Sequence, residues 1–210
     1  MAIAAASLLG GCSSDGGGDW LAMLQAARVA WDNRDSPVSL ADASSIPFAT
    51  LGLRIDGGRE QILILATDVA GDRLWTSSAK IALTVRNGRI VRTAGLGGDL
   101  SGYFSPIHKE DWTTPHRYSW TADFNSLGYY SVAINCDVRP MGPDAIVILE
   151  KRIDTIRVEE SCRSDRLDWS FTNTYWVNAQ SGRVWRSIEQ IIPKGQILEI
   201  ELLRPPLSPG

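Results

Sequence analysis

The sequence predicts a mainly β fold, in which one large antiparallel sheet curves into a half-open barrel or a sandwich, with one short N-terminal helix. About ten short segments combine apolar or alternating residues with turn signals between them. No stretch shows the regular alternation of strands with long helices that a parallel sheet requires. The composition, with 44% hydrophobic and 21% charged residues, is typical of a folded domain with a sizeable core.

The N-terminal residues resemble a lipoprotein processing signal. Met1–Gly10 is a short apolar stretch, and Leu9 lies three places before Cys12 with two glycines between them. This spacing is similar to the lipobox, in which small side chains fit the peptidase and the cysteine thiol takes a diacylglycerol. The resemblance implies that residues 1–11 are a signal peptide and that Cys12 is lipidated. Residues 12–18 would then be a flexible tether.

Two further features bear on this signal. Ser13 is not Asp, so the retention rule of enteric lipoproteins does not apply, and the resemblance implies the outer membrane. No Lys or Arg precedes the apolar run, which favours a translation start upstream of Met1. The alternative, a buried Cys12 on an apolar helix, is disfavoured by the Gly/Ser segment that follows. Beyond the first dozen residues, no apolar run approaches the roughly 18 residues that span a bilayer.

Residues 19–210 are expected to form a single β-rich domain that begins with the one short helix. Trp20–Ala30 carries apolar residues at helical spacing, with Asp19 as its N-cap. Residues 32–47 are rich in Asp, Ser and Pro and are expected to form a loop. The predicted strands span residues 48–56, 60–68, 80–86, 89–93, 118–124, 129–138, 145–149, 153–160, 170–178, 183–191 and 196–203.

Glycine-containing turns are expected to join several of these strands into hairpins. Asp56-Gly57-Gly58 and Asn87-Gly88 tolerate the positive φ that tight hairpin turns need. Residues 179–182 are expected to close a further hairpin between the strands on either side. The run Ile62–Leu65 is apolar at every position, which predicts a strand covered on both faces. Residues 96–115 show little periodicity and are expected to wrap as a loop.

Two cysteines remain when Cys12 is set aside. Outside the cytoplasm, the isolated pair Cys136 and Cys162 predicts a disulfide that closes a loop of about 26 residues. Two unpaired thiols are the alternative. A nucleophilic cysteine would need a histidine partner, and His108 and His116 both lie far from either cysteine in the sequence.

The common catalytic and metal-binding patterns are missing from the sequence, including the G-x-S-x-G elbow, the Walker loop, H-E-x-x-H and the dinucleotide fingerprint. Two histidines in one loop do not make a zinc site, so neither a metal nor a cofactor is expected. Glu159 and Glu160 are strand neighbours that point to opposite faces. Glu199 and Glu201 share a face, which is expected to be solvated because the apolar residues occupy the other. We therefore expect no enzymatic activity.

The chain has eight tryptophans, and most are expected to lie in the core. On strand 170–178, Phe171 and Tyr175 share one face, whereas Trp176 lies on the other and is expected to meet Trp185 across the hairpin. Aromatic side chains also bind sugars and partner proteins. Tyr175, Trp176 and Trp185 are therefore candidates for a glycan or partner contact, with core packing as the alternative.

Three segments, taken with the lipobox, resemble the YjbF/GfcB family of group 4 capsule polysaccharide lipoproteins. They are RNGRIVRTAGL (86–96), FTNTYWV (171–177) and SGRVWRS (181–187), and the resemblance extends in order from about Trp20 to Pro206. It implies an outer-membrane lipoprotein encoded in an exopolysaccharide or capsule operon, which acts beside a large outer-membrane β-barrel protein. The resemblance carries over no catalytic residues.

The leading hypothesis is a non-enzymatic accessory of exopolysaccharide or capsule assembly or export, lipid-anchored at the periplasmic face of the outer membrane. One alternative is a periplasmic carrier or chaperone for acyl chains, because a curved sheet can enclose an apolar cavity. Another is a glycan-processing enzyme, for which no acid and base lie at suitable spacing. The net charge of -3, without basic runs, excludes nucleic acid as an expected partner.

Overall fold

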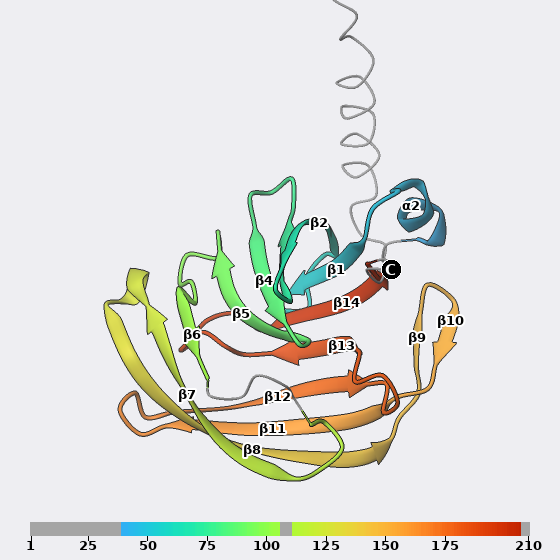
Figure 1. Cartoon of the computed structure of the whole chain (residues 1–210). Helices are drawn as coiled ribbons and strands as arrows, with labels where there is room; N and C mark the ends of the chain where they lie inside the picture. The colour runs from blue at the N-terminus through green and yellow to red at the C-terminus, as the bar shows by residue number, and fades with distance from the viewer. Residues whose placement is uncertain (1–38, 106–110, 207–210) are drawn as a thin grey trace, which may run out of the picture. The chain divides into compact units, whose positions relative to one another are not determined.

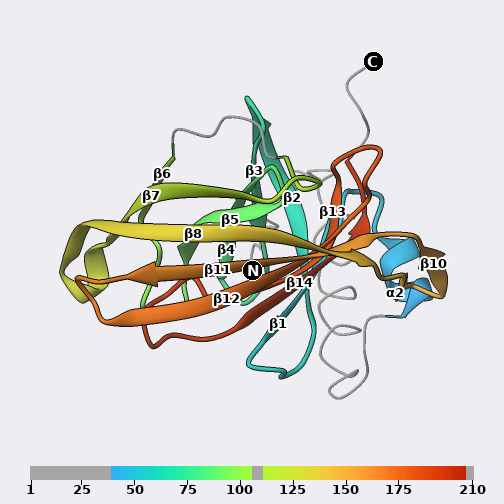
Figure 2. The ribbon, with the colours of Figure 1, turned by 90° about the horizontal axis from the view of Figure 1, so that it is seen from below.

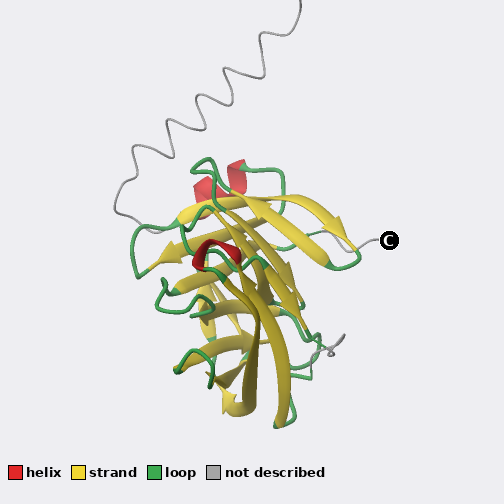
Figure 3. Cartoon of the chain, turned by 90° about the vertical axis from the view of Figure 1, so that its left-hand side faces the viewer, coloured by secondary structure: helices red, strands yellow, loops and turns green. Residues whose placement is uncertain are grey.

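Strands make up most of the computed structural model, which describes residues 39–105 and 111–206 (Figure 1). Within these residues, helix is confined to α2 (Leu40–Ser45) and the 3-10 turn η1 (Asn125–Leu127), drawn in red in Figure 3. The fourteen strands of this part of the chain are β1 (Thr50–Ile55), β2 (Gln61–Val69), β3 (Asp72–Thr76), β4 (Ala82–Arg86), β5 (Arg89–Ala94), β6 (Gly102–Phe104), β7 (His116–Phe124), β8 (Tyr129–Pro143), β9 (Ile146–Ile148), β10 (Lys151–Ile153), β11 (Ile156–Ser164), β12 (Trp169–Val177), β13 (Val184–Glu189) and β14 (Leu198–Arg204).

Twelve strands form one antiparallel sheet, in the order β5-β4-β3-β2-β1-β14-β13-β12-β11-β8-β7-β6. The sheet curls until its two edge strands, β5 and β6, come close together (Figure 1). At one end of this seam the backbone amide of Thr93 donates to the carbonyl of Leu100 at 2.9 Å. The sheet is therefore nearly closed into a barrel, which confirms the predicted curved antiparallel sheet.

One face of the sheet carries the core. The long strands β7, β8, β11 and β12 run side by side (Figure 2) and alternate buried with more exposed side chains. This period of two is what a sheet with one covered face requires. Large, fully buried side chains, including Trp75, Tyr175, Phe124 and Leu53, fill the interior.

The two predicted glycine-containing hairpin turns are confirmed, because their residues adopt positive φ. Asp56 and Gly57 adopt φ of 52° and 68° between β1 and β2, and Asn87 and Gly88 adopt 50° and 85° between β4 and β5. The hairpin closed by residues 179–182 is also present, since β12 pairs with β13. On β14 the inward positions are Leu198, Ile200 and Leu202, as the alternation predicts.

The helix found in the structure corrects the loop predicted over residues 32–47. Ser39 accepts a hydrogen bond from the backbone amide of Asp42, and the Asp42 carboxylate accepts one from the Ser39 amide. This reciprocal capping box starts α2 within the segment that was expected to be a loop. The helix predicted over Trp20–Ala30 lies outside the described residues.

Three strand predictions are wrong in detail. β3 was not predicted because its only adjacent apolar pair, Leu74 and Trp75, is too short to show a period. β6 lies inside the expected loop 96–115 and contains a glycine. The strand predicted over residues 153–160 begins too early, because residue 153 ends the separate strand β10 and β11 starts only at residue 156. The break between them occurs where the carbonyl of Thr155 accepts from the amide of Asp144.

The run Ile62–Leu65 is covered on one face and not on both. Leu63 is fully buried, whereas Ile64 on the opposite face is 37% exposed. The outer face of this strand is in contact with solvent, because no second layer of structure covers it there. A continuous apolar segment was therefore a misleading signal for double coverage at this position.

A two-stranded hairpin, β9–β10, lies outside the main sheet and covers part of its outer face. Ile146, Ile148 and Ile153 form a small apolar cluster on this hairpin. Trp176 of β12, Trp185 of β13 and Leu203 of β14 pack against that cluster. The described residues belong to one compact unit, and the predicted domain boundary at residue 19 lies outside them.

Candidate functional site

A buried ion pair between Arg89 and Glu160 forms the centre of the sheet interior. Arg89, the first residue of β5, is 5% exposed, and Glu160 on β11 is 1% exposed. The Arg89 Nη1 atom donates to Glu160 Oε1 at 2.5 Å. The guanidinium also lies over the rings of Trp112 and Tyr175, at 4.6 and 5.0 Å from their centroids. This contact ties an edge strand of the sheet to a strand far across it.

Glu160 accepts hydrogen bonds on both of its oxygens. The Tyr118 hydroxyl donates to Oε1 at 2.5 Å, and the Asn173 amide donates to Oε2 at 2.9 Å. The Tyr175 hydroxyl is also within reach of Oε2, at 3.2 Å. Burial raises the pKa of each tyrosine hydroxyl well above the usual value for this side chain. Both hydroxyls therefore stay protonated and act as donors. The buried carboxylate is thus satisfied as well as paired.

Glu189 on β13 is a second buried carboxyl next to this pair. Burial raises its pKa to about 7, and hydrogen bonds from the Ser187 hydroxyl and the Ile90 amide partly oppose that rise. These bonds measure 2.7 and 3.2 Å. A pKa in this range means that the charge of Glu189 changes near neutral pH.

Cys136 and Cys162 form a disulfide beside this cluster, as predicted. The two residues lie directly opposite each other on β8 and β11, with Cα atoms 4.1 Å apart. Both sulfurs lie within 4.8 Å of a Glu160 carboxylate oxygen, a grouping that resembles a metal site. Because the sulfurs are bonded to each other, they do not supply the thiolates that would bind a metal.

The interactions of this cluster serve to hold the fold together more than to bind a ligand. Its charged groups are enclosed and hydrogen-bonded to one another, and its members come from β5, β7, β11, β12 and β13. A network of this kind favours one arrangement of the strands around it. We infer that it holds the curled sheet in its nearly closed form.

The three aromatic residues predicted as contacts lie in two different places. Tyr175 is fully buried in the interior, so it offers no surface to a glycan or partner. Trp176 lies on the outer face, where its indole nitrogen donates to Asp144 Oδ2 at 2.9 Å and its ring packs beneath β9–β10. Its direct cross-strand partner is Arg186, because a bulge in the β12–β13 pairing displaces Trp185 from that position.

Trp185 packs beneath the same hairpin and also lines a cavity of about 270 Å³. Two segments that carry the family resemblance meet at this cavity, namely the Asn87-Gly88 turn and Ser181–Ser187. The approach is close: a Cβ added to Gly88 would lie 2.1 Å from Val184 Cγ2. The resemblance therefore includes residues whose packing requires a glycine.

The carboxylate pairs follow the predicted geometry, with one correction. Glu160 is buried and Glu159 partly exposed, so the two point to opposite faces. Glu199 and Glu201 share a face, but that face is not simply solvated, because Glu201 is only 7% exposed. Arg54 and Arg186 form ion pairs with both glutamates.

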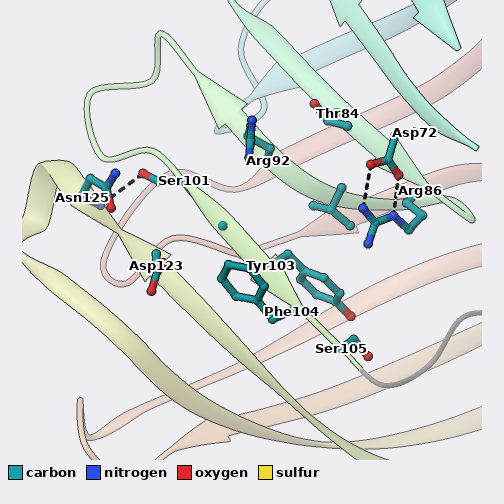
Figure 4. Close-up of a pocket in the computed structure, with 12 residues that line it drawn as sticks. Asp72, Thr84, Arg86, Arg92, Ser101, Tyr103, Phe104, Ser105, Asp123 and Asn125 are labelled. Atoms are coloured by element: carbon teal, nitrogen blue, oxygen red, sulfur yellow. Dashed lines mark hydrogen bonds and ion pairs between the residues drawn. The ribbon is translucent and has the colours of Figure 1, made fainter. Parts of the chain in front are cut away.

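An open groove of about 650 Å³ follows the seam between β5 and β6 (Figure 4). Figure 4 shows Tyr103 and Phe104 of β6 near its centre. Figure 4 also labels lining residues from β3–β5 on one side, and from β7, η1 and the two residues that flank β6 on the other. They are Asp72, Thr84, Arg86, Arg92, Ser101, Ser105, Asp123 and Asn125. The lining is polar and charged, with one strongly exposed aromatic ring.

The sequence did not identify Phe104, Arg89 or Glu160 as important residues. A signal for Glu160 was present, because it continues the inward series that begins with Val158 and ends with Cys162 and Ser164. A charged residue at an inward position indicates a buried partner. Phe104 gave no comparable signal, because the groove exists only after the sheet has curled.

The chain is similar to known proteins both in sequence and in fold. The family model described as group 4 capsule polysaccharide lipoprotein gfcB, YjbF matches residues 23–203. The lipoprotein GfcB of Escherichia coli K12 is 24% identical over 184 residues, which cover 83% of this chain and 85% of GfcB. The lipoprotein YjbF of the same organism is 22% identical over 147 residues, covering 66% and 68% of the two chains.

The crystal structure of the hypothetical lipoprotein YmcC from Escherichia coli K12 has the same fold. It superposes with a TM-score of 0.71 at 20% sequence identity, covering 93% of this chain and all of that one. In the described part of this chain, no helix is both long and apolar enough to cross a membrane. The match over residues 23–203 shows that the chain belongs to the YjbF/GfcB family of group 4 capsule polysaccharide lipoproteins.

Proposed function

We propose that this chain is a non-enzymatic accessory of exopolysaccharide or capsule assembly and export, lipid-anchored through Cys12 at the periplasmic face of the outer membrane. The observation that carries the proposal is the family match over residues 23–203. An outer-membrane β-barrel protein of the export system is the proposed partner. Anchoring would confine the folded body to a surface and raise its concentration near that partner.

The structure supports a binding role over a catalytic one. The buried carboxylate Glu160 is fully engaged in the interior, and Glu199 and Glu201 are held in ion pairs. The interior is filled by side chains such as Trp75 and Phe124, which gives no support to an acyl-chain carrier. An open polar groove, in contrast, is a surface that an extended polymer can reach.

Deleting the gene cleanly and measuring surface polysaccharide tests the proposed role. The expected result is less polysaccharide on the cell surface, or polymer of altered length, with recovery when the gene is supplied in trans. Unchanged polysaccharide in the deletion strain, under conditions in which the chain is normally produced, would contradict the proposal.

The anchor is tested separately by Cys12→Ser. The thiol is the acceptor for the lipid, so this variant is expected in the soluble fraction, folded and without lipid mass. Ser14→Ala is the matched control and should stay with the outer membrane. A Cys12→Ser variant that still fractionates with the outer membrane would show that something other than lipidation holds the chain there.

A further inference from the structure

The groove between β5 and β6 is lined by an exposed aromatic ring. Phe104 is 60% exposed, although it belongs to a strand. Its ring lies over Gly102, because a Cβ added at that glycine would be 2.9 Å from Phe104 Cε2 and 3.1 Å from Cζ. The neighbouring ring of Tyr103 stacks on Trp120 at 4.5 Å between centroids, which holds β6 against the core. Because Gly102 has no side chain, the Phe104 ring can lie against the backbone at that position. Much of the ring remains exposed to solvent.

Polar groups surround this ring on both sides of the groove (Figure 4). Asp123 lies next to it, since its Oδ2 is 3.4 Å from the same added Cβ at Gly102, and Asn125 follows on η1. Arg92 projects from β5 on the opposite side and is exposed. These carboxylate, amide and guanidinium groups can accept from and donate to hydroxyl groups.

The far end of the groove is held by an ion pair. Arg86 contacts Asp72 through two atoms, with Nη2 donating to Oδ2 at 2.6 Å, and this guanidinium holds the pKa of the Asp72 carboxyl below its usual value. Because these two charges compensate each other, they give the groove no excess charge of either sign. Arg92 and Asp123 also line the groove and carry opposite charges, so they add no net charge to it.

A ligand with an apolar face and many hydroxyl groups fits this combination. The C–H face of a pyranose ring stacks on an aromatic side chain, while its hydroxyl groups need polar partners at the ring edge. The groove is open and follows a seam, so it suits a segment of a chain more than an enclosed small molecule. A compact apolar ligand would leave the surrounding charged groups without partners.

We propose that this groove binds a pyranose segment of the surface polysaccharide, with one sugar ring stacked on Phe104 and its hydroxyl groups bonded to Arg92, Asp123 and Asn125. This inference rests on the proposed function and assigns it a contact surface. The surface differs from Tyr175, Trp176 and Trp185, because none of these three residues lines the groove between β5 and β6.

Isothermal titration calorimetry tests the site directly. The full-length chain in detergent is titrated with oligosaccharides cut from the surface polysaccharide of the strain that encodes it. Removing the ring with Phe104→Ala should weaken binding about tenfold or more, whereas Phe104→Trp should retain it. Phe48→Ala is the matched control, because Phe48 is 59% exposed but lies outside the groove, and it should bind like the wild type.

Two results would overturn the site. One is the absence of binding by the wild-type chain, and the other is equal affinity of the Phe104→Ala and Phe48→Ala variants. Complementation of the deletion strain separates this failure from failure of the proposed function. If the wild-type gene restores polysaccharide and Phe104→Ala restores it equally well, the role stands and the site is wrong.

Discussion

At the scale of single residues, the main feature is a set of charges placed where the sheet buries them. Arg89, Glu160 and Glu189 are each at most 5% exposed. The inward position of Glu160 follows from the strand period that correctly predicted Val158 as a core residue. The partner of Glu160 could not be predicted, because Arg89 lies 71 residues away in the sequence.

The pH dependence of stability is expected to follow Glu189. Its folded-state pKa of about 7 lies above the ordinary value of 4.5 for a glutamate carboxyl, so between these values the folded state holds a proton that the unfolded state has released. The free energy of unfolding should therefore fall as pH rises through this window. The loss from this group is about 3 kcal/mol, and stability from it is fully present only below the unfolded pKa.

Glu189→Gln tests this assignment, because the amide cannot ionise. Urea unfolding at about pH 5 and about pH 8 should show a smaller loss of stability in this variant than in the wild type. Glu159→Gln is the control, since Glu159 is partly exposed, and it should keep the wild-type dependence. An identical pH dependence of Glu189→Gln and wild type would show that Glu189 is not the titrating group.

At the scale of elements, the glycine-containing turns were predictable, whereas the strands β3 and β6 were not. The turns Asn87-Gly88 and Asp56-Gly57 can be recognised in the sequence, because the positive φ that they need depends only on the turn residues themselves. β3 and β6 are too short to display a period, and each is a strand because its neighbours supply hydrogen bonds. The bulge that displaces Trp185 is likewise a property of pairing, so the predicted Trp176–Trp185 pair was wrong.

Gly88→Ala is expected to destabilise the chain more than Gly71→Ala. Both glycines close two-residue turns at nearly equal φ, 85° and 88°. A Cβ at Gly71 meets nothing within 4 Å, so that variant should cost only the conformational strain of about 1 kcal/mol. At Gly88 the clash with Val184 should add about 1–3 kcal/mol more. Chemical unfolding measures the free energy of unfolding of both variants. An equal decrease in the two variants would contradict the close contact between Gly88 and Val184.

The disulfide between β8 and β11 should contribute through chain entropy. It spans 26 residues, for which loop closure is worth about 3.5 kcal/mol. The double variant Cys136→Ala/Cys162→Ala should lose a comparable free energy of unfolding, whereas Cys12→Ser should leave it unchanged. Mass spectrometry of the non-reduced protein checks the bond itself, and two free thiols there would contradict it.

At the scale of the whole molecule, the curled sheet creates the groove from residues that are separate in the sequence. The class of fold was predictable because alternation and hairpin turns occur along the chain. The closeness of β5 and β6 was not, because it depends on how twelve strands twist together. The family and the curved sheet were therefore predictable from the sequence. Of the candidate contact residues, Tyr175 lies in the core, Trp176 packs beneath β9–β10, and Trp185 lines a second cavity.

The proposed role of the whole molecule is that of a lipid-anchored chain that serves surface polysaccharide. The most direct test is the amount of surface polysaccharide in a clean deletion strain that produces either the wild-type chain or Cys12→Ser at equal levels. We expect the wild type to restore the polymer and Cys12→Ser to restore much less. Wild-type levels of polymer in the strain that lacks the gene would contradict the account.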